Sequence, residues 1–159
     1  TDIPICYTTM KYMYFKKLYK YVNIFISQMQ MRISGGILMT ITNGIVVDGS
    51  KSTGHVVVPE GVTSIGDHAF MYSNMESIEL PSTLTSIGYC AFTDCKNLKR
   101  LVIPDEVNEI SYGAFSGCEN LEYIYVPSTV KSLLTGDKFS HCKHLKKIII
   151  TISLDVDFY

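Results

Sequence analysis

Several signatures of common functional classes are missing from this sequence. It has no run of about 18 apolar residues, the length that a membrane-spanning helix requires. It also has no Gly-x-Ser-x-Gly elbow, glycine-rich phosphate loop or His-Glu-x-x-His pattern, which mark hydrolases, nucleotide-binding proteins and zinc peptidases. These absences argue against a membrane span. They favour a protein that is not an enzyme and that needs no cofactor.

Charged residues are also few, and neither sign predominates. Only 18% of the residues are charged, and the formal net charge is -1. Five cationic residues against Asp2 give residues 1–36 a net charge of +4, so the remainder carries -5. The rest of the chain therefore lacks the broad positive face with which proteins bind phosphate backbones. We expect no nucleic-acid partner.

The dominant feature is an internal repeat. Aliphatic-proline pairs recur at spacings of 22, 23 and 23 residues, and phenylalanines recur at 22, 23 and 24. The pairs end in Pro59, Pro81, Pro104 and Pro127, and the phenylalanines are Phe70, Phe92, Phe115 and Phe139. A fixed period of this length indicates a solenoid, in which each repeat buries its apolar face against the next.

Each repeat is expected to contribute one short strand. Outward and inward residues alternate in residues 77–80, 100–103, 123–126 and 147–150, as a half-buried strand requires. A proline follows three of these runs and, because it lacks an N–H donor, ends the strand at the same level in each coil. The sequence therefore predicts a parallel sheet, with an Ile-Gly-x-x-Ala-Phe stretch forming a helical turn or irregular bend between strands.

This pattern resembles the BspA-like class of leucine-rich repeats. Residues 84–104 show it best, reading Leu-Thr-Ser-Ile-Gly-Tyr-Cys-Ala-Phe-Thr-Asp-Cys-Lys-Asn-Leu-Lys-Arg-Leu-Val-Ile-Pro. The resemblance, which covers residues 56–150, implies an α/β-type leucine-rich repeat solenoid with one strand per repeat and no catalytic residues. It further implies a secreted or cell-surface protein that adheres to or recognises a protein or a glycan. The sequence itself shows no leader, because the apolar residues 21–26 are too few and lack a small-residue cleavage site.

Three segments are predicted along the chain. Residues 1–36 form a basic, aromatic segment that is a degenerate repeat, a capping helix or a poorly ordered leader. Residues 37–58 form a capping hairpin, in which Asn43-Gly44 favours a tight primed turn. Residues 59–159 form the repeats, of which the last is distorted. Its run at residues 148–152 leaves an apolar edge through which the chain can self-associate.

Three cysteines keep step with the repeat. Cys95, Cys118 and Cys142 each lie three residues after a repeat phenylalanine, while residues 71–73 interrupt this column in the first repeat. We favour a packed column of free thiols over a disulfide or a metal site, since a buried thiol packs as a small apolar group. The cluster His141-Cys142-Lys143-His144 is not expected to bind metal, because Cys142 faces inward and its neighbours face solvent.

The candidate binding residues lie on the outward face of the strands. Arg100, Tyr123, Tyr125 and Lys147 stand out, because aromatic and cationic side chains supply contact area and directional bonds in recognition sites. An ordinary solvated face, with tyrosine present for its strand propensity, is the alternative. A second functional hypothesis is a structural segment of a longer repeat array that self-assembles through its uncapped ends.

Overall fold

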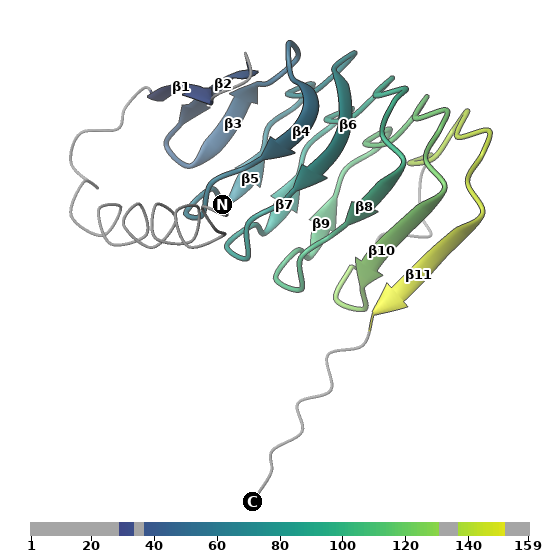
Figure 1. The fold of residues 1–159 in the computed structure, drawn as a ribbon. Coiled ribbons are helices and arrows are strands. Elements are labelled where there is room, and N and C mark those ends of the chain that lie inside the picture. The colour runs from purple at the N-terminus through teal and green to yellow at the C-terminus, as the bar shows by residue number, and fades with distance from the viewer. Residues whose placement is uncertain (1–28, 34–36, 131–136, 152–159) are drawn as a thin grey trace, which may run out of the picture.

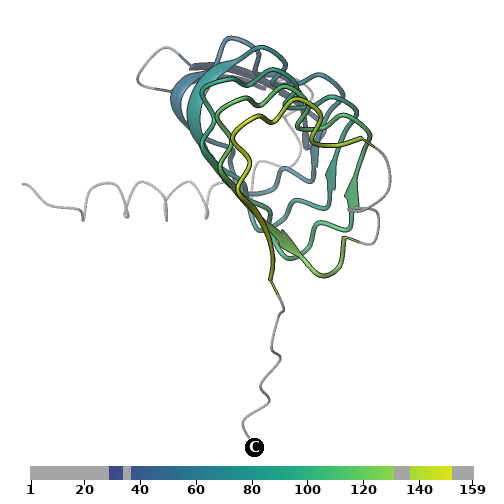
Figure 2. The ribbon, with the colours of Figure 1, turned by 90° about the vertical axis from the view of Figure 1, so that its right-hand side faces the viewer.

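Five short parallel strands lie side by side along one side of the molecule (Figure 1). The computed structural model describes residues 29–33, 37–130 and 137–151. The strands are β4 (Thr53–Val57), β6 (Asn74–Glu79), β8 (Arg100–Val102), β10 (Tyr123–Pro127) and β11 (Lys147–Thr151). Seen end-on, successive coils of the chain superpose around a common interior (Figure 2). The predicted solenoid of parallel strands is confirmed.

Three of the coils also contain a second, shorter strand that was not predicted from the sequence. These strands are β5 (Ser64–Ile65), β7 (Ser86–Ile87) and β9 (Glu109–Ile110), and they pair in parallel with one another. The isoleucine of each strand is buried, while the preceding residue is more exposed. The prediction of one strand per repeat is therefore incomplete.

The α/β designation is not confirmed, because no helix occurs in residues 29–33, 37–130 or 137–151. The backbone of the Ala-Phe segments bonds both to the next coil and within its own turn. The N–H of Phe70 donates to the carbonyl of Ala91 at 2.8 Å, and that of Phe92 donates to Ala114 at 2.8 Å, while the N–H of Ala69 donates to Gly66 in its own coil at 3.3 Å. Of the two expected conformations, a helical turn or an irregular bend, the described residues show the second, as a series of turns.

An antiparallel hairpin precedes the coils. Strand β2 (Ile37–Thr42) pairs with β3 (Ile45–Asp48) around Asn43 and Gly44, whose φ angles of 50° and 76° fit a primed turn. Strand β1 (Met29–Ile33) pairs with the other edge of β2, and β3 pairs in parallel with β5. Strand β4, predicted as part of this hairpin, pairs instead with β6. The boundaries of the three predicted segments stay predictions, and residues 1–28 lie outside the described residues.

A column of phenylalanine rings fills the interior. Phe70, Phe92 and Phe115 are fully buried, and successive ring centroids lie 5.3 and 5.7 Å apart with the planes 10° and 18° from parallel. Phe139 continues the column at 5.5 Å from Phe115. The alanine before each of the first three rings is also buried, so that the turn can approach the core closely.

A second column, of thiols, runs beside the rings. The Sγ atoms of Cys95, Cys118 and Cys142 each donate to the carbonyl of a phenylalanine in the preceding coil at 3.1 Å, and all three cysteines are free. The predicted interruption of this column at residues 71–73 does not occur, because Ser73 continues it. Its Oγ atom lies 3.3 Å from the Cys95 Sγ atom, in the place that a thiol takes in later coils. The column therefore joins coils through hydrogen bonds between a side chain and the backbone.

We predict that Cys118 stabilises the fold chiefly as a hydrogen-bond donor. Cys118→Ala should lower the free energy of unfolding by about 1–3 kcal/mol, because it leaves a small cavity and an unpaired Phe92 carbonyl. Cys118→Ser keeps a donor, as Ser73 does, and should cost less. Urea unfolding of both variants measures the difference. Equal losses would show that the thiol matters only for its volume.

Stability should fall at alkaline pH because of the buried thiols. Burial raises the pKa of Cys142 from 9.0 to about 11, while the hydrogen bond with Cys95 and burial raise that of Cys118. A group whose pKa is higher in the folded state stabilises fully below its unfolded pKa. For Cys142 this stabilisation should decline between pH 9 and 11. Urea midpoints across that range should fall less for Cys142→Ser than for the unmodified chain, and parallel curves would contradict the assignment.

Candidate functional site

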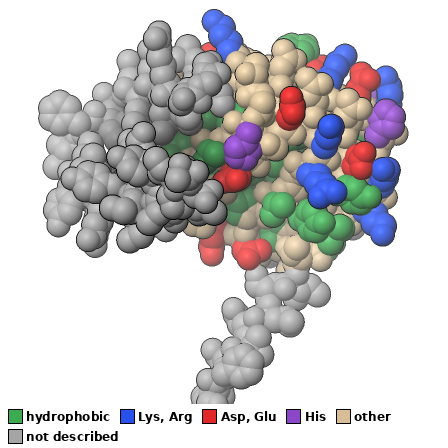
Figure 3. All heavy atoms as spheres, viewed as in Figure 1, with side chains coloured by type: hydrophobic (Ala, Val, Ile, Leu, Met, Phe, Trp, Pro, Cys, Tyr) green, Lys and Arg blue, Asp and Glu red, His purple; other side chains and the backbone are tan. Residues whose placement is uncertain are grey.

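The outward residues of β8, β10 and β11 form two rows across the strands. The register places Tyr123 opposite Arg100 on one side and Lys147 on the other. The next outward residue of each strand forms the second row, which consists of Val102, Tyr125 and Ile149. All four predicted binding residues therefore lie on one face, which we call the sheet face. Figure 3 shows hydrophobic and cationic side chains gathered towards this end of the molecule.

Tyr123 is flanked by cations from both neighbouring coils. The guanidinium carbon of Arg100 lies 5.5 Å from the centre of its ring, and Lys146 Nζ lies 5.8 Å from it. A cation at this distance is attracted by the negative face of an aromatic ring. Lys146 also donates to Glu122 at 3.0 Å, which raises the pKa of Lys146 and lowers that of Glu122. The ring is thereby held in place.

Lys146 was not among the predicted binding residues, although the repeat pattern indicates its position. It follows Leu145 as Glu122 follows Leu121, so the repeat places the two side chains in adjacent coils. Val102 and Ile149 were recognised as outward residues but were not selected. Val102 is 59% exposed, and together with Tyr125 it gives the sheet face an apolar centre.

The ladder of main strands is interrupted between β6 and β8. These strands belong to separate sheets, β4–β6 and β8–β10–β11. On either side of this interruption, the residue before the proline donates its N–H to a carbonyl of the next coil. Val58 donates to Glu79 at 3.0 Å, and Ile103 donates to Tyr125 at 2.8 Å. We call the gap between β6 and β8 the seam. Leu80 is the residue before the proline in the coil of β6, and within the described residues its N–H makes no such bond.

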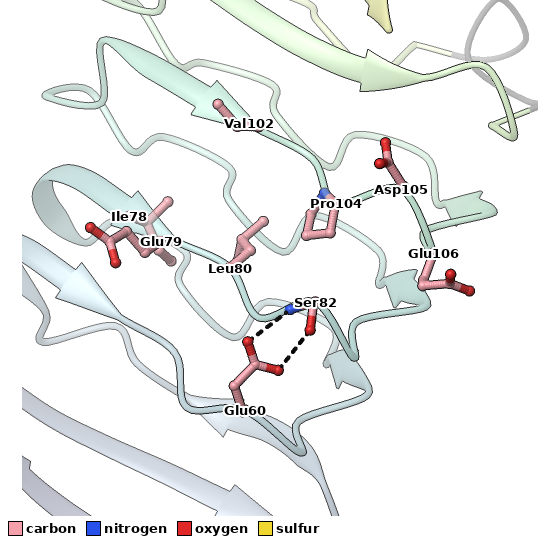
Figure 4. A pocket seen from close by; sticks show the side chains of 9 residues that line it. All are labelled: Glu60, Ile78, Glu79, Leu80, Ser82, Val102, Pro104, Asp105 and Glu106. Carbon is pink, nitrogen blue, oxygen red and sulfur yellow. Dashed lines mark hydrogen bonds between the residues drawn. The ribbon is translucent and has the colours of Figure 1, made fainter. Parts of the chain in front are cut away.

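A hollow of about 760 Å³ opens at the seam (Figure 4). Its apolar lining consists of Ile78, Leu80, Val102 and Pro104, and its polar lining consists of Glu60, Glu79, Ser82, Asp105 and Glu106. Glu60 accepts hydrogen bonds from the backbone and the hydroxyl of Ser82, at 3.2 and 3.0 Å. No cation lines the hollow, so it is acidic with an apolar floor. This hollow was not predicted from the sequence.

His55, Ser77 and Glu79 form a hydrogen-bonded group on the outward side of β4 and β6. The Nδ1 atom of His55 lies 2.7 Å from Ser77 Oγ, and its Nε2 atom lies 3.2 Å from Glu79 Oε1. A nucleophile relay has the same order of groups, but it works in a water-excluded site with donors for an oxyanion. Here the His55 and Glu79 side chains are 53% and 67% exposed. We interpret this group as a polar link between coils.

The cluster at residues 141–144 does not converge on one point. Cys142 donates inward to the Phe115 carbonyl at 3.1 Å, whereas His144 Nδ1 lies 2.8 Å from the Glu119 carbonyl in the preceding coil. Among the residues that the structure describes, no three His, Cys, Asp or Glu side chains are grouped so that they could hold a metal ion. Nor does the described part of the chain contain a helix long and apolar enough to cross a membrane.

Stacked coils, each with a main strand and a turn built on Ala-Phe, define a leucine-rich repeat solenoid. The model of the BspA type leucine rich repeat region, with six copies, matches residues 48–156. The chain belongs to this family, which confirms the resemblance found in the sequence. A comparison with curated proteins gave no match.

Solved structures of bacterial leucine-rich repeat proteins share the fold. A protein from Treponema pallidum is 30% identical, with a TM-score of 0.53, over 60% of this chain and 45% of that chain. One from Bacteroides capillosus is 23% identical, with a TM-score of 0.65, over 79% and 99% of the two chains. A leucine rich cell surface protein from Faecalibacterium prausnitzii is 24% identical, with a TM-score of 0.53, over 79% and 40%. The chain thus spans less than half of the first and third of these proteins.

Proposed function

We propose that the sheet face of β8, β10 and β11 recognises a partner macromolecule, and that Arg100, Tyr123, Tyr125 and Lys147 make the principal contacts. Membership of the family indicates a repeat-based protein-interaction module. The observation that supports this particular surface is the row in which Arg100, Tyr123 and Lys147 lie side by side. Tyrosine and arginine are the residues that most often dominate binding energy in interfaces.

The preorganised Tyr123 ring strengthens this proposal. Its contacts with Arg100 and Lys146 restrict the ring before any partner arrives. A side chain that is already ordered loses less entropy on binding, so more of its contact energy appears as affinity. An ordinary solvated strand face would not need such an arrangement. We further propose that recognition takes place at a cell surface, the location that the name of the Faecalibacterium protein gives for that relative, and that it serves adhesion.

Replacing both tyrosines should abolish selective binding without unfolding the chain. A random peptide library displayed on phage would be selected on the immobilised protein, and the selected clones would be titrated against Tyr123→Ser/Tyr125→Ser. We expect a loss of affinity of about tenfold or more, equivalent to about 1.4 kcal/mol. Circular dichroism should show an unchanged fold, because neither ring is part of the core.

Tyr89→Ser/Tyr112→Ser is the matched control. These tyrosines are exposed, where Tyr123 and Tyr125 are half-buried, and they stack on each other with centroids 6.1 Å apart, but they lie outside the main strands. The control should retain full affinity for the selected clones. Equal affinity of the two double variants would contradict the proposed surface.

Self-association through β11 is a second candidate function. Strand β11 is the outermost strand of its sheet, and its core-facing Ile148 and Ile150 are 40% and 52% exposed. The equivalent residues of β10, Ile124 and Val126, are fully buried by β11 and its coil. An open strand edge with apolar side chains favours pairing with another chain.

Ile150→Lys should prevent this association, because a charge at the edge cannot be buried against a second strand. Light scattering over a range of concentrations should show growth in mass for the unmodified chain and a constant mass for the variant. Val47→Lys, on the exposed side of β3, is the control and should behave like the unmodified chain. A concentration-independent monomer of the unmodified chain would exclude assembly through this edge.

A further inference from the structure

We propose that the partner of the sheet face is a polypeptide segment of mixed charge. Its acidic end lies over the first outward row, from Arg100 to Lys147, its apolar middle lies over the second outward row, and its basic end lies in the hollow at the seam. The inference rests on the proposed function, since it names the chemistry of the partner at the same face. It is carried by the opposite charges that this face presents at its two ends.

The β8–β11 end presents cations that are not neutralised. Within the described residues, neither Arg100 nor Lys147 forms an ion pair with a carboxylate, whereas Lys146 is paired with Glu122. Arg100 is held against Tyr123, which orients its guanidinium group. A preoriented guanidinium binds a carboxylate through two parallel hydrogen bonds. This end therefore fits acidic side chains.

The seam presents the opposite charge. Of the four carboxylates of the hollow, Glu79 lies 3.2 Å from His55 and Glu60 accepts from Ser82, and within the described residues none is paired with a lysine or arginine. Asp105 and Glu106 are exposed on one side of the hollow, and Leu80 lines it on the other side of Pro104 (Figure 4). Lysine and arginine bury an aliphatic stem and keep a charged head near the surface. This combination of walls and carboxylates fits such a side chain.

A continuous apolar strip joins the two ends. Val102 lines the hollow and also begins the row that continues through Tyr125 to Ile149. Beside it, the Leu80 N–H lacks the bond that its counterparts make to the next coil. A polypeptide can supply both an apolar side chain for the strip and a carbonyl acceptor for this N–H.

A glycan fits this surface less well. An anionic polysaccharide carries like charge along its length, and its extension towards the seam would bring it against the four carboxylates. A neutral sugar would leave Arg100, Lys147 and the carboxylates of the seam without partners of opposite charge. The distribution of charge therefore favours a polypeptide.

The spacing of the strands sets the length of the segment. Two hydrogen-bonded steps of about 4.8 Å lead from β11 to β8, and the open step from β8 to β6 is at least as wide, so the face spans at least about 14 Å. An extended chain rises by about 3.3 Å per residue, so the two ends of the segment lie at least roughly four residues apart. A short linear motif is sufficient to span the face.

Fluorescence anisotropy with three labelled peptides of equal length tests the proposal. All would share an aliphatic centre, and their ends would be two aspartates and two lysines, aspartates only, or lysines only. The mixed peptide should bind the full chain at least about threefold more tightly than either of the others at low salt, a factor typical of one exposed charge pair. Heparin, as an anionic glycan, should bind more weakly than the mixed peptide.

Reversing one charge at the seam should change this preference. Glu106→Lys is expected to reduce the advantage of the mixed peptide over the all-aspartate peptide by about threefold. Glu109→Lys makes the same charge change on β9, in the other sheet, and should leave the ratio unaltered. The proposal is overturned if the all-aspartate peptide or heparin binds the unmodified chain as well as the mixed peptide, or if none of the probes binds.

The Tyr123→Ser/Tyr125→Ser variant distinguishes a failure of the mixed-charge partner from a failure of the recognition surface. Suppose that a uniformly acidic probe binds the unmodified chain as tightly as the mixed peptide does, and that this variant no longer binds that probe. The recognition surface then stands and the mixed-charge partner is wrong. If every probe that binds does so equally well with and without the tyrosines, the recognition surface itself is wrong.

Discussion

Stacking of phenylalanine rings between coils is the interaction on which the rest of the structure depends. Phe70, Phe92 and Phe115 are fully buried only because each ring is covered by the next. A single coil has nothing to cover its ring, so it is stable only against a neighbour. The ring column also keeps the coils in register. Arg100 and Tyr123 lie together on the sheet face as a consequence of that register, with no specific attraction needed to bring their strands together.

Charges in the loops reinforce the same register. Glu119 lies between Lys143 and Lys96, at 3.1 and 3.4 Å, and these two lysines lower its pKa. Such exposed pairs add little to stability. Lysine and glutamate nevertheless alternate from coil to coil at this position, so that adjacent coils carry opposite charges. A coil packed against the next coil but one would meet a side chain of the same sign. Since the loop charges neutralise one another, the unpaired cations of the strands remain available to a partner.

Features that depend on the period could be predicted from the sequence, and features that depend on bonds between coils could not. The period alone fixes which residues face outward, so the row of Arg100, Tyr123 and Lys147 was predictable. It also fixes the thiol column, although Ser73 was misread because its chemistry differs while its position does not. The second strands and the position of Lys146 over Tyr123 arise from backbone pairing and side-chain conformation, which a repeat pattern does not encode. The small alanine allowed either a helical turn or an irregular bend, and only the bonds between and within coils decide for the bend.

The seam follows from a difference of one residue in repeat length. One residue separates Ser73 from Met75 near the start of β6, whereas two separate Cys95 from Leu98 in the next coil and Cys118 from Leu121 in the one after. Strand β6 therefore begins immediately after its bend, while β8 begins only after an added turn. Coils of the same length, which carry β8 and β10, pair throughout β8. Unlike coils leave the ladder open, and this opening lets carboxylates and apolar side chains line a hollow within an otherwise closed surface. A change in repeat length thus divides one face into an acidic part and a cationic part, and a solenoid of uniform repeats would lack this division.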